Sequence, residues 1–260
     1  LATGVDITHH KDVLARISAS ESTWVLHMAA ITDVDGVEQE RSLGAAGKAW
    51  QGNVVATGAI VDACRQAGKK LLYISTDYVF DGAKDEYAET DQPNPQGWYA
   101  VTKWEGEKKI MTLGEGGVIV RIANPYRSRD PIKGDFVHKI LDRLAAGQTV
   151  VAPSDQIFVP TFVDDIAPAL RTIIQANGSG IYHVVGSDAL SPYEAAKTIA
   201  RVYGYQESLV GETTFAAYFV GRAPRPFHAR LRHDRITQLG IQMSDFASGV
   251  ASVKRQDSAQ

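Results

Sequence analysis

Cysteine is nearly absent from this sequence, and so are long apolar runs and an excess of either charge. The single cysteine, Cys64, excludes an internal disulfide framework. No run of residues approaches the roughly 18–20 apolar residues of a membrane span. Basic and acidic side chains number 27 and 30, whereas a nucleic-acid-binding protein usually presents a strongly basic face. We therefore expect a globular protein of a reducing, cytoplasmic compartment, with neither a membrane nor a nucleic acid as partner.

In the first half of the chain, short apolar runs alternate with helical patterns. The apolar runs predict three strands buried on both faces, at 24–30, 71–75 and 118–122. Helices are expected at 48–66, ending at Gly68, and at 98–111. The turn-rich segment 81–96 predicts a long loop, which is usually functional in a compact domain. This alternation predicts an α/β fold, a doubly wound parallel sheet with helices on both faces.

The second half of the chain has a looser pattern. It predicts helices at 136–146, 163–175 and 191–203 and a strand at 180–185, with Ser191 as a helix N-cap. The polar residues at the end of the chain predict a frayed terminus. We expect a sheet domain at 1–150 and, at 151–260, mainly a smaller substrate-binding lobe interleaved with the sheet.

A tyrosine and a lysine, Tyr99 and Lys103, lie one helical turn apart in the expected helix 98–111. A nearby ammonium lowers the pKa of a phenol from its usual value of about 10. The phenol then becomes a general acid or base that is usable near neutrality. Tyr193 and Lys197 have the same spacing but belong to an ordinary capped helix. We therefore predict chemistry at the first pair and coincidence at the second.

Thr76 comes directly after the expected buried strand 71–75. Open parallel sheets bind their ligands at the carboxyl ends of their strands. A hydroxyl at that place can hydrogen-bond a substrate carbonyl while Tyr99 supplies the proton. The alternative is a threonine that only forms the turn at the end of a strand. Its place ahead of a Tyr-x-x-x-Lys helix favours the catalytic interpretation.

The segment 73–82, YISTDYVFDG, resembles the signature of dTDP-4-dehydrorhamnose reductases, which belong to the extended short-chain dehydrogenase/reductase group. Other segments resemble the same family in the same order along the chain: 29–35, 53–57, 89–95, 155–161 and 225–231. Because the similar segments span nearly the whole chain in order, a chance match of one motif does not explain them.

The resemblance implies reduction of the 4-keto group of a nucleotide-activated deoxysugar, with NADP(H) or NAD(H) bound by a Rossmann-type domain at 1–150. It implies Tyr99 as proton donor, Lys103 as the ribose-binding and pKa-lowering residue, and Thr76 as the partner of the carbonyl. Further implied site residues line the cofactor, at Ala30, Ile31 and Thr32, or the substrate, at Asp77, Asn124 and Arg225. The implied partner is a nucleotide sugar, and the resemblance also allows a homodimer.

Arginines crowd the final part of the chain, at Arg222, Arg225, Arg230, Arg232 and Arg235. Arginine suits bidentate contacts with a diphosphate. A solvated basic surface is an equally good interpretation for most of them. Arg225 is favoured as a substrate residue because it belongs to a segment that resembles the family.

The sequence departs from the family in two places. Asn124 stands where the resemblance implies a tryptophan beneath the sugar, so we expect a preference for a sugar other than dTDP-4-dehydrorhamnose, or a weaker preference. No glycine-rich loop joins a strand to a helix. In the family, the segment with that loop would precede Leu1. We therefore expect about 30–40 residues of the family pattern to be missing and this chain to bind a dinucleotide weakly.

Alternative functions share the same scaffold. Nucleotide-sugar dehydratases usually carry an acidic pair directly after the catalytic threonine, whereas Asp77 is followed by Tyr78 here, which favours reduction over dehydration or epimerisation. A non-catalytic alternative is a subunit similar to the regulatory subunit of methionine adenosyltransferase, and retention of the three catalytic residues argues against it. His9, His10 and Asp33 do not form a metal-ligand spacing with a second cluster, so no metal is expected.

Overall fold

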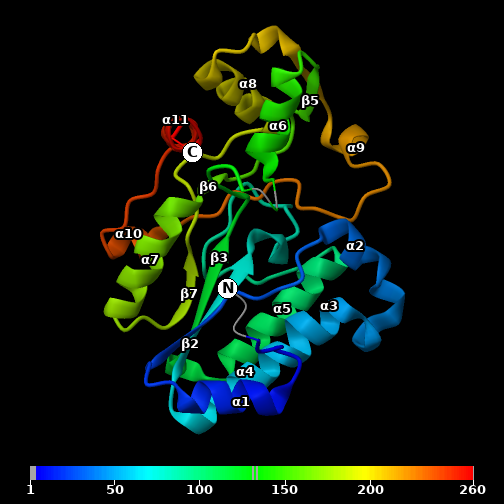
Figure 1. The fold of residues 1–260 in the computed structure, drawn as a ribbon. Helices are drawn as coiled ribbons and strands as arrows, with labels where there is room; N and C mark the ends of the chain where they lie inside the picture. Colours follow the sequence, from blue (N-terminus) through cyan, green and yellow to red (C-terminus); the bar gives the residue numbers. More distant parts are fainter. Residues whose placement is uncertain (1–3, 131, 133, 260) are drawn as a thin grey trace.

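A four-stranded parallel sheet forms the centre of the computed structural model, which describes residues 4–130, 132 and 134–259. Its strands, in spatial order, are β1 (Trp24–His27), β2 (Lys70–Thr76), β3 (Gly117–Ile122) and β7 (Gly180–His183). Every neighbouring pair is parallel (Figure 1). The predicted parallel sheet is confirmed, and the predicted strand 180–185 ends two residues early, at His183.

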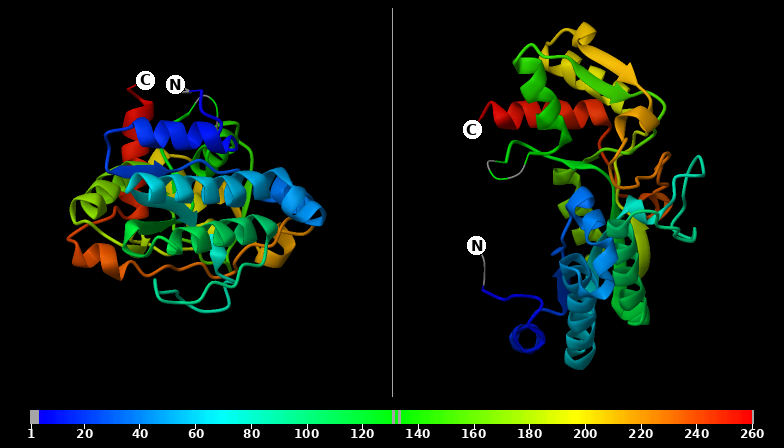
Figure 2. Two further views of the ribbon diagram at one scale, coloured as in Figure 1. Left: turned by 90° about the horizontal axis from the view of Figure 1, so that it is seen from below. Right: turned by 90° about the vertical axis from the view of Figure 1, so that its right-hand side faces the viewer.

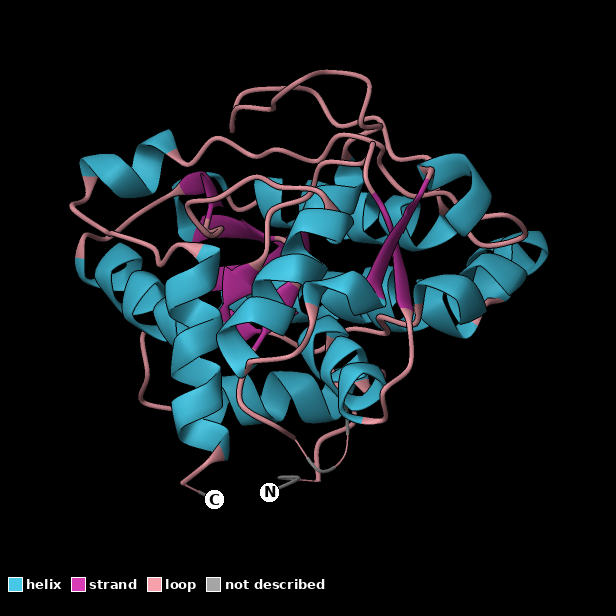
Figure 3. Cartoon of the chain, turned by 90° about the horizontal axis from the view of Figure 1, so that it is seen from above, coloured by secondary structure: helices cyan, strands magenta, loops and turns pink. Residues whose placement is uncertain are grey.

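Helices cover both faces of this sheet, as predicted for a doubly wound fold (Figure 3). On one face lie α4 (Ala56–Ala67) and α5 (Trp98–Met111), with α1 (His10–Ala19) against α4. On the other lie α7 (Val163–Gln175) and α10 (Asp234–Gln238). Successive residues of β2 enter different cores, because Leu71 packs with the α4 side and Leu72 with the α7 side. Apolar side chains on both faces are the reason that β2 has a continuous apolar run.

The strand predicted at 24–30 is shorter and more exposed than expected. β1 ends at His27 and pairs only with β2 among the described residues. Leu26 is 44% exposed and Met28, just beyond the strand, is 56% exposed. The prediction of burial on both faces is therefore wrong for β1. An apolar run favours a strand, but the number of neighbouring elements determines how deeply the strand is buried.

A second lobe stands at one end of the sheet (Figure 2). Its core holds residues of α6 (Phe136–Ala145), β5 (Val150–Pro153), α8 (Pro192–Tyr203), β8 (Val210–Thr213) and α11 (Phe246–Asp257). The predicted helices at 136–146, 163–175 and 191–203 are confirmed, and Ser191 forms a capping box with Glu194. The predicted frayed terminus is wrong, because Phe246 and Val250 of α11 are buried in the lobe core.

The remaining elements are short. α2 (Val34–Gln39) and α3 (Lys48–Trp50) lie between β1 and α4 and pack against α5, whereas β4 (Pro125–Tyr126), β6 (Thr161–Phe162) and α9 (Phe215–Tyr218) follow later in the chain. The predicted helix 48–66 consists of α3, a π-helical turn and α4, and it ends at Gly68 in the left-handed conformation. No helix in the described part of the chain is long and apolar enough to cross a membrane.

The lobe does not follow one continuous segment of the chain. Its core begins with Tyr126, whereas α7, β7 and α10, from the second half of the chain, pack onto the sheet. The sheet domain and the lobe are interleaved because the chain passes back and forth between them. The proposed boundary at residue 150 coincides with the first residue of β5 and stays a prediction.

Candidate active site

Thr76 and Tyr99 meet at the carboxyl end of β2. Thr76 is the last residue of the strand and accepts a hydrogen bond from the Tyr78 backbone N–H at 3.3 Å, which turns the chain sharply. The Thr76 hydroxyl donates to Asp77 Oδ1 at 3.0 Å. The side chains of Thr76 and Tyr99 are hydrogen-bonded to each other. The structure thus brings together two residues that the sequence placed only on separate elements.

Tyr99 lies in the first turn of α5, in a tightly packed place. Its side chain is buried, and its ring meets the Tyr78 ring edge-on at 5.9 Å between centroids. Burial raises the pKa of Tyr99 above its usual value, the Asp77 carboxylate adds to the rise, and the hydrogen bond with Thr76 opposes it. The predicted lowering of the pKa of Tyr99 is therefore wrong for the described residues, because loss of hydration outweighs the hydrogen bond with Thr76, and the neighbouring Asp77 and Tyr78 also raise the pKa.

Lys103 lies one turn further along α5 and is also buried. Its Nζ donates to the Ile74 carbonyl at 2.8 Å and stands 4.0 Å from the centroid of the Tyr73 ring. Burial lowers the pKa of Lys103 to about 7, and the Glu107 carboxylate opposes this shift. Lys103 therefore exchanges between ammonium and amine near neutral pH. This behaviour suits a residue that takes part in proton transfer.

The segment expected to line the cofactor follows β1. Ala30 is partly exposed, and Ile31 and Thr32 are exposed. Asn53 holds this segment, because its Oδ1 accepts from the Ile31 N–H at 2.8 Å and its Nδ2 donates to the Ile31 carbonyl at 3.0 Å. The same Nδ2 donates to Thr102 on α5 at 3.0 Å. Asn53 thereby couples the β1 loop to the helix of Tyr99 and Lys103, a role visible in the sequence only as part of a segment similar to the family.

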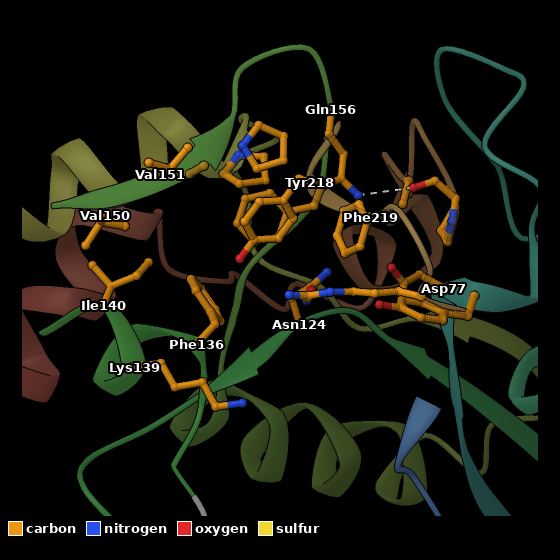
Figure 4. A pocket seen from close by; sticks show the side chains of 18 of the residues that line it. Asp77, Asn124, Phe136, Lys139, Ile140, Val150, Val151, Gln156, Tyr218 and Phe219 are labelled. Atoms are coloured by element: carbon orange, nitrogen blue, oxygen red, sulfur yellow. Dashed lines mark hydrogen bonds between the residues drawn. The ribbon is translucent and has the colours of Figure 1, made fainter. Parts of the chain in front are cut away.

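A cavity of about 460 Å³ opens at Asp77, the residue after Thr76, and extends into the lobe. Asp77 and Asn124, which follow β2 and β3, line its sheet side. Figure 4 shows Asn124, Phe136 and Tyr218 around the same space. The lobe side combines aromatic and basic side chains: Phe136, Lys139, Arg143, Tyr218, Phe219 and Arg222. Of these lobe residues only Arg222, as part of the arginine cluster, was visible in the sequence, because side chains on α6 and in the segment from α9 onwards reach the cavity only through the packing of the lobe.

Asn124 occupies a backbone conformation that few residues tolerate. Its φ is +42°, in the left-handed region where asparagine is among the less costly side chains. Its carbonyl accepts from the Thr161 N–H at 3.3 Å, which ties the end of β3 to β6. The Asn124 side chain therefore both suits the local backbone conformation and forms part of the pocket surface.

Arg225 is placed behind the pocket wall. Its guanidinium donates to Asp35 Oδ2 and to the Ala223 carbonyl, at 2.8 and 2.7 Å, and lies 4.8 Å from the Phe219 ring centroid. In the structure it supports Phe219 and the segment after α9. A direct contact with the substrate stays a prediction. Tyr193 and Lys197, in contrast, lie on α8 in the lobe, where the lysine packs 5.0 Å from the ring of its own tyrosine.

The family model described as RmlD substrate binding domain matches residues 2–258. The chain belongs to this family. It is 31% identical to the dTDP-4-dehydrorhamnose reductase of Aggregatibacter actinomycetemcomitans, covering 96% of this chain and 86% of that protein. The predicted resemblance to dTDP-4-dehydrorhamnose reductases is confirmed.

Two further members of this similarity group are informative. The crystal structure of dTDP-4-dehydrorhamnose reductase from Bacillus anthracis, in complex with NADP, has a TM-score of 0.87 and 28% identity, covering 97% of this chain and 87% of that chain. Methionine adenosyltransferase 2 subunit beta of Bos taurus is 31% identical, covering 87% of this chain and 68% of that protein. Both the reductase and the regulatory-subunit alternatives thus have relatives at similar identity.

The residues of this RmlD-family chain fit one end of a nicotinamide cofactor. The segment of Ala30 to Thr32 follows β1, and the buried Tyr99 and Lys103 lie at the carboxyl end of β2, the neighbouring parallel strand. The Ser75 hydroxyl is buried there without a hydrogen-bond partner among the described residues. These groups suit a nicotinamide and its ribose. Residues 4–130, 132 and 134–259 contain no glycine-rich turn between a strand and a helix that would match a pyrophosphate.

Proposed function

We propose that this RmlD-family protein uses NAD(P)H to reduce the 4-keto group of a nucleotide-activated deoxysugar. The observation that carries the proposal is the hydrogen-bonded pair of Thr76 and Tyr99, with Lys103 one turn away, beside a cavity of about 460 Å³. Relatives named dTDP-4-dehydrorhamnose reductase, one of them in complex with NADP, support it.

Thr76, Tyr99 and Lys103 have different roles in protonating the substrate. The nicotinamide, when bound, supplies a hydride. Thr76 hydrogen-bonds the carbonyl oxygen and fixes its position. Tyr99 keeps its proton in the resting state, because burial raises its pKa, and donates it once the oxygen becomes strongly basic. Lys103, which stays close to β2 through the Ile74 carbonyl, stabilises in its ammonium form the phenolate that Tyr99 leaves behind.

The lobe side of the cavity suits the nucleotide. Lys139, Arg143 and Arg222 offer positive charge for a diphosphate, and Phe136 and Tyr218 offer flat apolar surfaces for a base or a sugar. Asp77 and Asn124 lie at the sheet end, nearer the reacting group, and offer hydrogen bonds to sugar hydroxyls. We infer that the substrate lies with its sugar at β2 and its nucleotide towards α6.

Oxidation of NADPH and of NADH by the full-length gene product, with a panel of 4-keto sugar nucleotides, tests this function. We expect reduction of at least one substrate. Because Asn124 hydrogen-bonds but does not stack under a ring, we expect another sugar to be reduced faster than dTDP-4-dehydrorhamnose. A highest rate with dTDP-4-dehydrorhamnose would contradict the inference from Asn124 and leave the reductase function standing.

A regulatory subunit like methionine adenosyltransferase 2 subunit beta is the second candidate, favoured by the relative from Bos taurus. A regulatory subunit needs neither the hydrogen bond between Thr76 and Tyr99 nor a buried Lys103. Because this chain has both, an enzyme is the favoured function. Capture of a methionine adenosyltransferase by the purified protein, together with no oxidation of either nucleotide, would reverse this preference. A dehydratase is disfavoured because Tyr78, which follows Asp77 and lines the pocket, is a phenol and not a second acid.

A further inference from the structure

Asp77 is a buried carboxyl group with an unpartnered oxygen at the pocket. The residue is 2% exposed and lines the cavity. Its Oδ2 has no hydrogen-bond partner among the described residues. Leaving a polar atom buried and unpaired costs about 1–3 kcal/mol, and more for a charged group. A folded protein retains such a group where it has a use, and here the group borders the reacting end of the pocket.

The other oxygen of Asp77 begins a chain of hydrogen bonds to Tyr99. Thr76 Oγ1 lies 3.0 Å from Asp77 Oδ1. The Thr76 side chain is also hydrogen-bonded to Tyr99. A hydroxyl both donates and accepts, so the Thr76 group can receive a proton from one neighbour as it releases its own to the other. The three side chains therefore connect the pocket to the phenol through a continuous path.

We propose that Asp77 is a further catalytic residue, a proton reservoir that recharges Tyr99 through the hydroxyl of Thr76. The proposal rests on the reductase function proposed above, because only a reaction that consumes the Tyr99 proton needs a reservoir.

Each step of the proposed relay breaks one bond to hydrogen and forms another. The hydride forms a C–H bond at the carbonyl carbon, which is reduced as the nicotinamide is oxidised, and the Tyr99 O–H bond breaks as its proton passes to the carbonyl oxygen. Asp77 then releases its carboxyl proton to Thr76 Oγ1, and the Thr76 hydroxyl releases its own proton to the Tyr99 phenolate. Asp77 is left as a carboxylate and regains a proton from solvent that enters the pocket lined by this residue. One proton from solvent is consumed for each carbonyl reduced.

The surroundings of Asp77 keep its acid form available at neutral pH. Burial raises the pKa of Asp77 to about 7, and the hydrogen bond from Thr76 opposes the shift. The charged or titratable groups that face it are Tyr78, Tyr99 of α5, Arg222 across the pocket, and the Asp35–Arg225 pair behind Tyr78. A donor with a pKa near the working pH is the most effective kind.

Asp77→Asn in the full-length gene product tests the reservoir, with Asp62→Asn on the exposed side of α4 as the matched control. We expect kcat of the wild-type protein to fall as the pH rises past about 7. In Asp77→Asn this fall should become shallower, because only the loss of the Lys103 ammonium, whose pKa is also about 7, remains, and kcat at pH 6 should be lower by about tenfold or more. KM for the sugar nucleotide and Kd for dTDP should change far less, because the asparagine amide still offers a hydrogen bond to the sugar. Asp62→Asn should keep the wild-type profile.

A measurement on the wild-type protein alone tests the relay even if the Asp77→Asn variant does not fold. The measurement is kcat in mixtures of light and heavy water. If two protons move along the path in one step, a plot of kcat against the deuterium fraction of the solvent should be curved. A linear plot would overturn the relay. An Asp77→Asn variant with the wild-type pH profile and only a raised KM would also overturn it and assign Asp77 to sugar binding. Oxidation of neither NADPH nor NADH by the wild-type protein would overturn the relay together with the reductase function.

Discussion

At the scale of single residues, burial decides the chemistry of the site more than the neighbouring charges do. Tyr99, Asp77 and Lys103 are each 8% exposed or less. The neutral form is favoured in all three, with a raised pKa for the phenol and the carboxyl and a lowered one for the amine. A site made of groups that hold or release protons close to neutrality suits proton delivery to a developing alkoxide.

Tyr99→Phe should remove the proton donor with little change in folding. Because Tyr99 supplies the proton in the transition state, we expect kcat to fall by roughly 10²–10⁴-fold. The measurement is turnover by the full-length gene product at saturating substrate, with circular dichroism as a check on folding. Tyr193→Phe is the control, since that tyrosine has the same Tyr-x-x-x-Lys spacing on α8 in the lobe. Turnover by Tyr99→Phe close to the wild-type rate would disprove the assignment.

Asp77→Asn should change stability in a pH-dependent way. A carboxyl with a pKa of about 7 in the folded protein and about 3.9 when unfolded binds more protons in the folded state. It therefore contributes stability at low pH that is lost as the pH rises from about 4 to about 7. We expect Asp77→Asn to gain stability relative to wild type between pH 5 and pH 8, measured by urea unfolding at both values. A stability difference that is the same at both pH values would contradict the raised pKa of Asp77.

At the scale of elements, a buried ion pair attaches the catalytic helix to the sheet. Arg121 of β3 donates to both oxygens of Glu107 on α5, at 3.0 and 2.7 Å, and both side chains are fully buried. His183 of β7 lies 3.4 Å from the same guanidinium and bonds the Arg232 carbonyl at 2.7 Å. Glu107 is one turn beyond Lys103, so this contact holds the part of α5 that carries the catalytic residues.

Arg121→Met should destabilise the protein strongly, because it leaves the Glu107 carboxylate buried without a partner. We expect a loss of about 3–5 kcal/mol in the free energy of unfolding. The double variant Glu107→Gln with Arg121→Met should recover part of this loss, since no buried charge remains. Arg65→Met, which breaks the exposed pair with Asp62, should cost no more than about 1 kcal/mol. Equal losses in urea unfolding for the buried and exposed variants would contradict the role given to the buried pair.

At the scale of the whole molecule, the pocket depends on the meeting of two parts of the chain. β2 and β3 supply Asp77 and Asn124, whereas α6 and the segment after β8 supply the aromatic and basic wall. The lobe core holds α6 against α8, which keeps Lys139 and Arg143 at the cavity. Figure 2 shows this lobe rising from one end of the sheet.

The basic wall should govern affinity for the nucleotide diphosphate. We expect Lys139→Gln and Arg222→Gln each to weaken dTDP binding by roughly tenfold, because a hydrogen bond to a charged group is worth about 1.5–3 kcal/mol. The loss for thymidine, which has no phosphate, should be much smaller. Titration calorimetry at low and high salt measures both effects. Lys197→Gln, a change on α8 at a half-buried residue that does not line the pocket, is the control. Equal losses of affinity for dTDP and for thymidine would contradict the binding of the diphosphate at this wall.

The sequence by itself determined the elements and the local spacing of the site. Helices 98–111 and 163–175 were predicted with the bounds that the structure has, because helical periodicity and end signals lie within each segment. The Tyr99–Lys103 spacing and the place of Thr76 at a strand end are equally local. The parallel sheet followed from the alternation of such segments.

Only the tertiary structure decided the exposure, the partners and the pKa shifts of these residues. The direction of the Tyr99 pKa shift, the exposed edge of β1 and the pairing of Arg225 with Asp35 all depend on elements distant in the chain. The pocket wall on α6 and α9 and the buried helix α11 depend on how the lobe packs. Hydration and electrostatic screening are properties of all the surrounding atoms together, so a pattern along one segment does not contain them.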